Sequence, residues 1–122
     1  MSGNSKTGAP GGSTGEPQTV RELLELMPGA LNPAAAAGLA LTYQFEINGS
    51  ENFTAYLRIE DQQAVFHEGP AERPEVIIRA PAEVWLAVSR GELNGAQAFM
   101  TGKFKATGNL MLLMKLQSLF SK

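Results

Sequence analysis

Residues 39–60 decide the fold, and their sequence is LALTYQFEINGSENFTAYLRIE. Apolar and polar residues alternate from Leu39 to Ile47 and again from Phe53 to Ile59, and such alternation is typical of half-buried strands. Asn48-Gly49 separates the two runs and begins a turn of about four residues. The stretch predicts a β-hairpin with one apolar and one polar face, which favours an antiparallel sheet over a parallel sheet buried on both faces.

The rest of the chain predicts a sheet of five strands with helices on one face. Pro81 marks the first turn of a helix that ends near Arg90-Gly91. Because strands and helices segregate along the chain, the expected fold class is α+β, with a mainly antiparallel sheet. Further strands are expected at residues 64–68, 76–79 and 103–107, and further helices at residues 95–100 and from residue 110 onward.

The domain is expected to begin at Thr19. Thr19 and Glu22 have the spacing of a capping box, and apolar residues then recur at helical spacing up to Met27. Residues 1–18 consist mostly of Gly, Ser, Thr and Pro, with no large apolar residue after Met1. Such a segment has nothing to bury. We therefore expect a disordered tail at residues 1–18 and one domain at residues 19–122.

Composition excludes several classes of protein. The 122 residues suffice for one domain, and the net charge of −2 gives no basic excess for nucleic-acid binding. The absence of cysteine excludes disulfides and thiolate metal sites. The longest apolar run, Leu110–Met114, is far shorter than the ~20 residues that span a bilayer, and the first residues lack the apolar core of a signal peptide.

No group of residues has the spacing of a catalytic or metal site. The single histidine, His67, lies in a short strand pattern without a metal-binding partner, so a surface position is expected. Glu46, Glu60 and Asp61 fall on polar strand faces or in turns and are interpreted as solvated charges. Lys103 and Lys105 alternate along the fifth strand, where they form a solvated face or meet anionic lipid head groups. We expect no enzymatic activity and no metal.

The last helix carries more apolar side chains than one packing face needs. Met111 and Met114 lie with Leu110 outside the apolar arc of the helix. Three interpretations of this surplus remain open: ordinary core packing, the lining of a lipid pocket, or an interface with a second copy or a partner enzyme. The arc itself consists of Leu112, Leu113, Leu116, Leu119 and Phe120.

The segment that leads into this helix resembles a known family. Residues 97–117 read QAFMTGKFKATGNLMLLMKLQ, which is similar to the Gly-Lys-x-Lys-x-x-Gly-Asn signature and apolar helix of the sterol carrier protein type 2 family. Residues 76–94, VIIRAPAEVWLAVSRGELN, resemble the strand and helix before that signature. The resemblance covers residues 19–122, although Asn94-Gly95 stands where members often have Asn-Pro.

The resemblance implies an apolar tunnel between the sheet and the helices, which binds fatty acids, fatty acyl-CoA or sterols without covalent chemistry or a cofactor. The inward strand residues Phe45, Phe53, Leu57 and Phe66 would form its floor. Its other lining residues, carried over from the matching motifs, would be Trp85, Phe99, Met100, Phe104, Leu110, Leu113, Met114 and Leu116.

The expected function is therefore lipid binding and transfer, with transient membrane contact. The alternative is an accessory module that dimerises or assists an enzyme of lipid or quinone metabolism. Because the final residues, Phe120-Ser-Lys, lack the peroxisomal Ser-Lys-Leu address, a bacterial or archaeal cytoplasm is the expected location.

Overall fold

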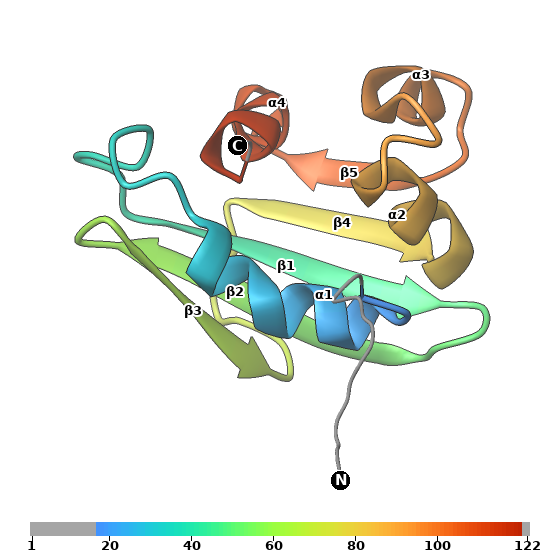
Figure 1. Ribbon diagram of the computed structural model, residues 1–122, viewed down its shortest axis with the longest axis horizontal. Coiled ribbons are helices and arrows are strands. Elements are labelled where there is room, and N and C mark those ends of the chain that lie inside the picture. Colours follow the sequence, from blue (N-terminus) through green and yellow to red (C-terminus); the bar gives the residue numbers. More distant parts are fainter. Residues whose placement is uncertain (1–16, 121–122) are drawn as a thin grey trace, which may run out of the picture.

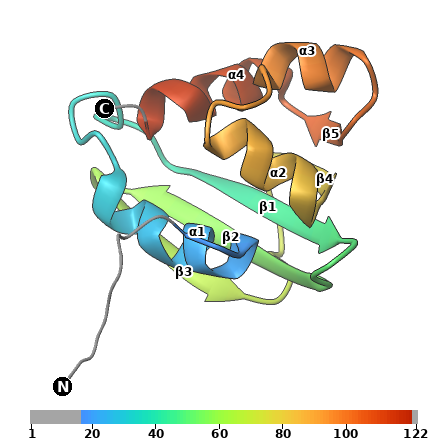
Figure 2. The same ribbon diagram turned by 45° about the vertical axis from the view of Figure 1, so that its right-hand side comes forward.

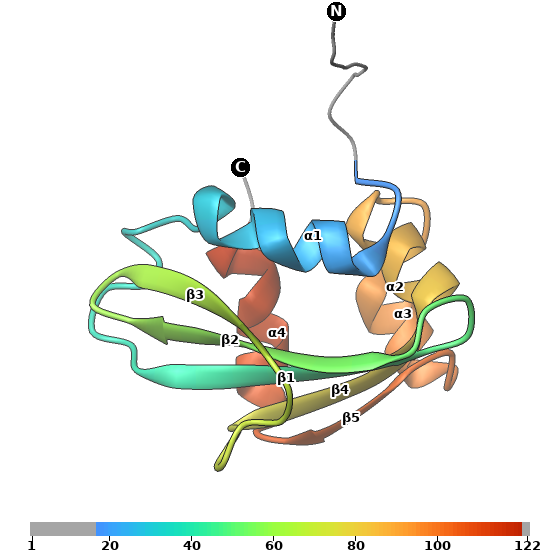
Figure 3. The same ribbon diagram turned by 90° about the horizontal axis from the view of Figure 1, so that it is seen from below.

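Five strands form one mixed sheet, and the helices lie on one side of it (Figures 1 and 3). The computed structural model describes residues 17–120, and the predicted tail falls almost wholly outside them. The order of strands across the sheet is β3-β2-β1-β4-β5. The strands are β1 Leu41–Asn48, β2 Phe53–Glu60, β3 Gln63–Glu68, β4 Val76–Pro81 and β5 Lys105–Gly108. The helices are α1 Val20–Leu26, the 3-10 turn η2 Met27–Ala30, α2 Ala82–Ser89, α3 Gly95–Met100 and α4 Leu110–Leu119.

The predicted α+β class is confirmed, and the pairing of β1 explains the mixed sheet. β1 pairs antiparallel with β2, as the hairpin pattern predicts. It pairs parallel with β4, from Tyr43 opposite Val76 onward, while the other pairings in the described chain are antiparallel. The sheet is therefore mainly antiparallel, with one parallel pair at its centre.

The core lies between the inner face of the sheet and the helices. Alternate residues of β1, including Tyr43 and Phe45, are fully buried, and Leu57 and Ile78 face them from β2 and β4. Leu24 of α1 and Leu119 of α4 are also fully buried. Helices from both ends of the described chain thus pack on one apolar sheet face.

Two caps fix α1 over the sheet. The predicted capping box is present, with the Thr19 side chain accepting from the Glu22 amide and the Glu22 side chain accepting in return. Glu51, from the β1–β2 turn, accepts hydrogen bonds from the amides of Val20 at 2.7 Å and Arg21 at 3.1 Å. This second cap joins the helix to the hairpin and also places a negative charge at the positive end of the helix.

The connection from β3 to β4 crosses the outer face of the sheet. β3 and β4 run in the same direction and are separated in the sheet by β2 and β1. Residues 69–75 therefore pass over β2 and β1 to reach the start of β4. This crossing buries Thr42 and Gln44, although both point away from the core. Gln44 Oε1 accepts from the Ala71 amide at 2.8 Å, which fixes the crossing segment.

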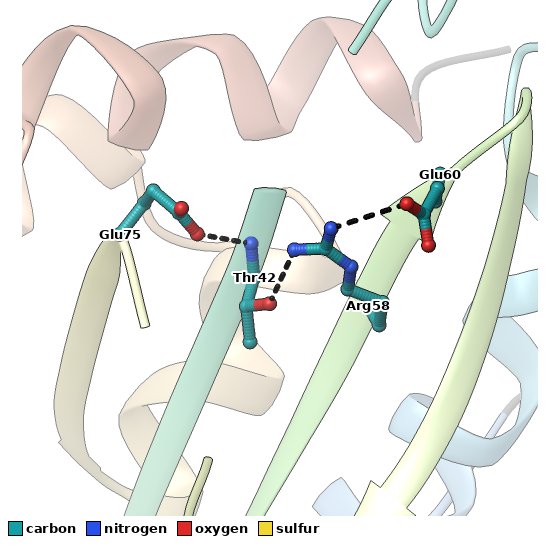
Figure 4. A network of polar contacts seen from close by, with 4 residues as sticks. All are labelled: Thr42, Arg58, Glu60 and Glu75. Carbon is teal, nitrogen blue, oxygen red and sulfur yellow. Dashed lines mark hydrogen bonds and ion pairs between the residues drawn. The ribbon is translucent and has the colours of Figure 1, made fainter. Parts of the chain in front are cut away.

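A network of polar contacts joins β1 to β2 and to the residue before β4, near the start of β1 (Figure 4). The Glu75 carboxylate accepts from the Thr42 amide at 2.6 Å, and the Glu75 amide donates to the Thr42 carbonyl at 3.0 Å. Arg58 donates to the Thr42 hydroxyl at 3.1 Å and pairs with Glu60 at 3.4 Å. The backbone of Thr42 is therefore paired just before the parallel ladder begins.

No helix within residues 17–120 has the length and apolar character needed to cross a bilayer.

Candidate functional site

A cavity of about 610 Å³ lies among helices α2, α3 and α4, and is partly open to solvent. Figure 2 shows these three helices grouped at one side of the molecule. Met27 of η2 closes the cavity on the side of α1. The lining residues are Met27, Trp85, Val88, Ser89, Gly91, Leu93, Asn94, Gly95, Ala96, Phe99, Phe104, Leu113, Met114, Leu116, Gln117 and Phe120.

Aromatic rings form one wall of the cavity. Trp85 of α2 packs edge-on against Phe104, with 5.4 Å between ring centroids, and Phe99 of α3 lies 5.6 Å from Phe104. Behind this wall Trp85 also contacts Phe45 of the sheet at 5.7 Å. Aromatic pairs at these separations are favourable contacts, so the wall is an apolar surface joined to the core through Trp85.

The opposite wall is α4, whose position depends on a buried hydroxyl. Tyr43 Oη donates a hydrogen bond of 2.6 Å to the carbonyl of Leu112. Burial raises the pKa of Tyr43 above its ordinary value, which extends the pH range over which the hydroxyl stays protonated and can donate. Asn109 caps the helix by accepting from the amides of Met111 and Leu112. These contacts turn Leu113 and Leu116 toward the cavity.

The described lining carries no acidic, basic or other titratable side chain. Two of its polar groups already have backbone partners: the Ser89 hydroxyl donates to the Leu86 carbonyl at 2.8 Å, and Asn94 Oδ1 accepts from the Gln97 amide at 2.9 Å. General acid–base catalysis requires a titratable group within reach of the substrate. The cavity is therefore suited to holding an apolar molecule.

The sequence matches the SCP-2 sterol transfer family over residues 20–121. The chain belongs to this family. The resemblance in the Gly-Lys and Gly-Asn signature is thereby confirmed for nearly the whole described chain.

The chain is similar to one part of a longer curated protein. Hydroxysteroid dehydrogenase-like protein 2 of Rattus norvegicus is 29% identical over 103 residues, which cover 84% of this chain and 20% of that protein. The chain thus spans about a fifth of the length of this curated relative.

Solved structures show the same fold alone and inside a larger enzyme. Palmitated SCP2L2 from Aedes aegypti superimposes with a TM-score of 0.64 at 21% identity, over 84% of this chain and 92% of that one. The sec-alkylsulfatase Pisa1 from Pseudomonas sp. gives 0.74 at 15% identity, over 82% of this chain and 16% of that one. The SCP-2 fold therefore occurs in chains of very different length.

Six of the residues carried over from the family resemblance line the cavity, and whether they contact a lipid stays a prediction. Met100 and Leu110 are exposed by 82% and 45% and lie outside the lining. The six residues that line the cavity are Trp85, Phe99, Phe104, Leu113, Met114 and Leu116.

The strand residues predicted as the floor lie elsewhere. Phe45 and Leu57 are fully buried in the sheet–helix core. Phe66 is half-buried opposite Leu57, and Phe53 lies under the Arg21 guanidinium, 4.9 Å from it. None of the described lining residues belongs to β1–β4, and the inward side chains of β1, β2 and β4 are instead buried in the core. A tunnel between the layers thus stays a prediction.

Several lining residues were not anticipated from the sequence. Val88, Leu93 and Phe120 face the cavity from the end of α2, the loop after it and the end of α4. The apolar spacing of Val84, Trp85 and Val88 carried a signal for one of them. The apolar arc of the last helix includes Phe120 and indicates its burial, although not its place in a cavity. Nothing local predicts Leu93, because its position depends on how three short helices meet.

His67 lies on the other side of the sheet. Its ring is exposed and stacks on Tyr56, with 4.8 Å between centroids. Both rings border a shallow groove beneath the β3–β4 connection, together with Arg58 and Arg73. Within residues 17–120, no three His, Asp or Glu side chains gather closely enough to hold a metal ion.

Proposed function

We propose that the chain binds an apolar lipid, such as a fatty acid or a sterol-like molecule, in the cavity among α2, α3 and α4. The observation that carries the proposal is an uncharged, aromatic-walled cavity of about 610 Å³. Ligand sites usually measure about 300–1,000 Å³ and are lined mainly by apolar side chains. Membership of the SCP-2 sterol transfer family and the palmitated Aedes aegypti protein of the same fold support it.

The energetics favour a long acyl chain as the ligand. Burying each methylene is worth ~0.8 kcal/mol, so a sixteen-carbon chain gains roughly 12 kcal/mol on leaving water. The described lining offers no cation to a carboxylate. A fatty acid would therefore place its chain against Trp85 and Leu116, and its head group toward the open side of the cavity.

The proposed role is binding and transfer without covalent chemistry. Within the described chain, no titratable side chain lines the cavity, and the aromatic wall offers mainly van der Waals contact. We also propose that this takes place in the cytoplasm, because a carrier of this kind acts by moving lipid through water.

A fluorescent fatty-acid titration tests the proposal. Ala96 of α3 and Ala34 of the turn after η2 are both exposed, and of the two only Ala96 lines the cavity. Ala96→Phe should narrow the cavity and weaken binding at least tenfold, while the control Ala34→Phe should bind like the parent chain. The absence of saturable binding at micromolar concentration, or equal binding by both variants, would contradict the proposal.

A second candidate function is that of an accessory module for an enzyme. The rat relative and Pisa1 are several times longer than the region that they share with this chain. In such an arrangement the cavity would deliver an apolar substrate to a neighbouring active site, or the exposed side of α4 would contact a second copy. Sedimentation velocity distinguishes this candidate: a monomer that still binds lipid supports an independent carrier, and a stable dimer supports the module.

A further inference from the structure

The acidic and basic residues of this chain are separated along the sequence. Residues 1–92 contain all 12 acidic residues and six basic ones, which gives a net charge of −6. Residues 93–122 contain four lysines and no acidic side chain, for a net charge of +4. An overall charge of −2 therefore hides a basic segment that begins just before α3 and includes β5 and α4.

The same segment carries most of the large apolar side chains that the described chain exposes. Met100 and Met111 are each exposed by 82%, Met114 by 59% and Leu110 by 45%. Leu110, Met111 and Met114 lie on the side of α4 turned away from Leu113, Leu116 and Leu119, which are buried. Burying methionine is favourable, so an exposed group of this kind normally marks a contact surface.

The fold places this segment on one side of the molecule. Elements α3, β5 and α4 lie together along the side formed by the edge strand β5, in both views (Figures 1 and 2). Lys103 is exposed two residues before β5, Lys105 is exposed at the start of β5, and Lys115 is half-buried on α4. The nearby Glu75 directs its carboxylate to the Thr42 amide. Basic and apolar side chains are thus combined in a segment without acidic residues. Glu46 lies one strand further in and pairs at 2.7 Å with Arg79, which stands opposite Lys105.

We propose that this surface, formed by Met100, Lys103, Lys105, Leu110, Met111, Met114 and Lys115, docks on an anionic lipid bilayer. Interfacial segments combine apolar side chains, which enter the head-group region, with lysines that meet anionic lipids. The two features coincide here in one continuous segment. A nucleic-acid backbone would use the lysines but leave the methionines in water, so the bilayer accounts for both.

Docking in this orientation would turn one wall of the cavity toward the membrane. Phe99 of α3 and Met114 of α4 line the cavity, and each belongs to an element of the docking surface. A lipid leaving the bilayer would therefore pass directly between α3 and α4. This route rests on the proposed lipid-binding function, whereas the docking itself does not.

Vesicle flotation tests the docking surface with variants of equal charge. The probes are phosphatidylcholine vesicles with and without about 30% phosphatidylglycerol. Each lysine that meets the anionic lipid should raise the affinity for these vesicles roughly fivefold. Lys103→Glu should lower binding to anionic vesicles at least fivefold. Arg73→Glu changes the net charge equally on the β3–β4 connection, where Arg73 is exposed, and should leave binding within twofold.

A second pair of variants tests the contribution of the exposed apolar side chains to vesicle binding. Met111→Gln should lower binding to anionic vesicles several-fold, while Leu26→Gln, at a position exposed by 56% on α1, should not. Lys103→Glu should retain fatty-acid binding in the absence of vesicles, so failure of docking and failure of lipid binding remain distinguishable.

Three results would overturn the docking proposal. The first is equal loss of vesicle binding in Lys103→Glu and Arg73→Glu, and the second is equal binding of the parent chain to neutral and anionic vesicles. The third is a dimer in sedimentation that Met111→Gln dissociates while vesicle binding is unchanged. That result would assign the surface to a second copy of the chain.

Discussion

Tyr43 links the sheet to the helix that walls the cavity. Its side chain is fully buried in β1, and its hydroxyl reaches the Leu112 carbonyl in the first turn of α4. Burying a hydroxyl is unfavourable unless it forms a hydrogen bond. The bond to the Leu112 carbonyl satisfies the Tyr43 hydroxyl and also fixes the position of α4.

Replacing Tyr43 by phenylalanine should loosen α4 without disturbing the core. Tyr43→Phe removes one hydrogen bond and keeps the ring, so the free energy of unfolding should fall by about 1–2 kcal/mol. Tyr56→Phe, at a half-buried position on the outer face, should change it by less than about 0.5 kcal/mol. Equal losses in urea unfolding of the two variants would show that the Leu112 contact has no special role.

Because the pKa of Tyr43 is raised in the folded chain, we expect the chain to lose stability in alkali. Burial raises the folded-state pKa of Tyr43 above the ordinary value of 10.0. Above about pH 10 the unfolded chain loses this proton while the folded chain keeps it, so the free energy of unfolding should fall by about 1.4 kcal/mol per pH unit. Below pH 10 the group is protonated in both states and stability is unaffected. Urea unfolding between about pH 9 and pH 11 should show this extra slope in the parent chain and not in Tyr43→Phe.

At the residue scale, the sequence predicts local contacts well and distant ones poorly. The Thr19–Glu22 capping box depends on residues three apart and is present as expected. The Tyr43–Leu112 bond joins residues 69 apart, and no local pattern indicates it. Leu93 and Phe120 are missed as lining residues for the same reason, because they meet only after three helices have packed.

Gly108 joins β5 to α4 and sets the direction in which the helix leaves the sheet. Its φ of +100° lies in the region that favours glycine, and a Cβ there would clash with the Glu75 carbonyl oxygen. The next amide, of Asn109, donates to that same carbonyl at 2.9 Å. The close approach of the two backbones therefore requires glycine at this position.

Alanine at Gly108 should destabilise the chain more than alanine at a comparable glycine. Gly108→Ala adds a backbone clash to the unfavourable φ, so the free energy of unfolding should fall by more than about 2 kcal/mol. Gly102 has a φ of +79°, and within the described chain a Cβ added there would meet no atom within 4 Å. Gly102→Ala should therefore cost only about 1 kcal/mol. Thermal unfolding of both variants checks this order, and a reversed order would refute the close approach as the reason for glycine.

At the element scale, periodicity predicts which elements form but not how they pair. The β1–β2 hairpin follows from alternation and a turn, and its register is the one that places both apolar faces inward. The parallel pairing of β1 with β4 requires the β3–β4 connection to cross the outer face of the sheet. This crossing buries the polar side chains of Thr42 and Gln44. Polar residues in a strand are expected to face water, so this crossing leaves no recognisable pattern in the sequence.

The whole molecule combines a closed sheet–helix core with a cavity among the helices. The strand side chains Phe45 and Leu57 are fully buried, and the cavity is bounded by α2, α3 and α4 instead. The family motif identifies much of this wall, since Phe99, Phe104 and Leu113 lie within or beside it. The depth of the cavity depends on helix packing and is known only from the structure.

A single tryptophan offers the most direct test of the central claim that an apolar ligand occupies this cavity. The chain contains one tryptophan, Trp85, which lines the cavity. Bromine on an acyl chain quenches tryptophan emission only on close contact. Titration with a mid-chain brominated fatty acid should therefore quench Trp85 saturably at micromolar concentration, and Ala96→Phe should raise the concentration needed at least tenfold. Quenching that fails to saturate, or that persists unchanged in Ala96→Phe, would contradict the account.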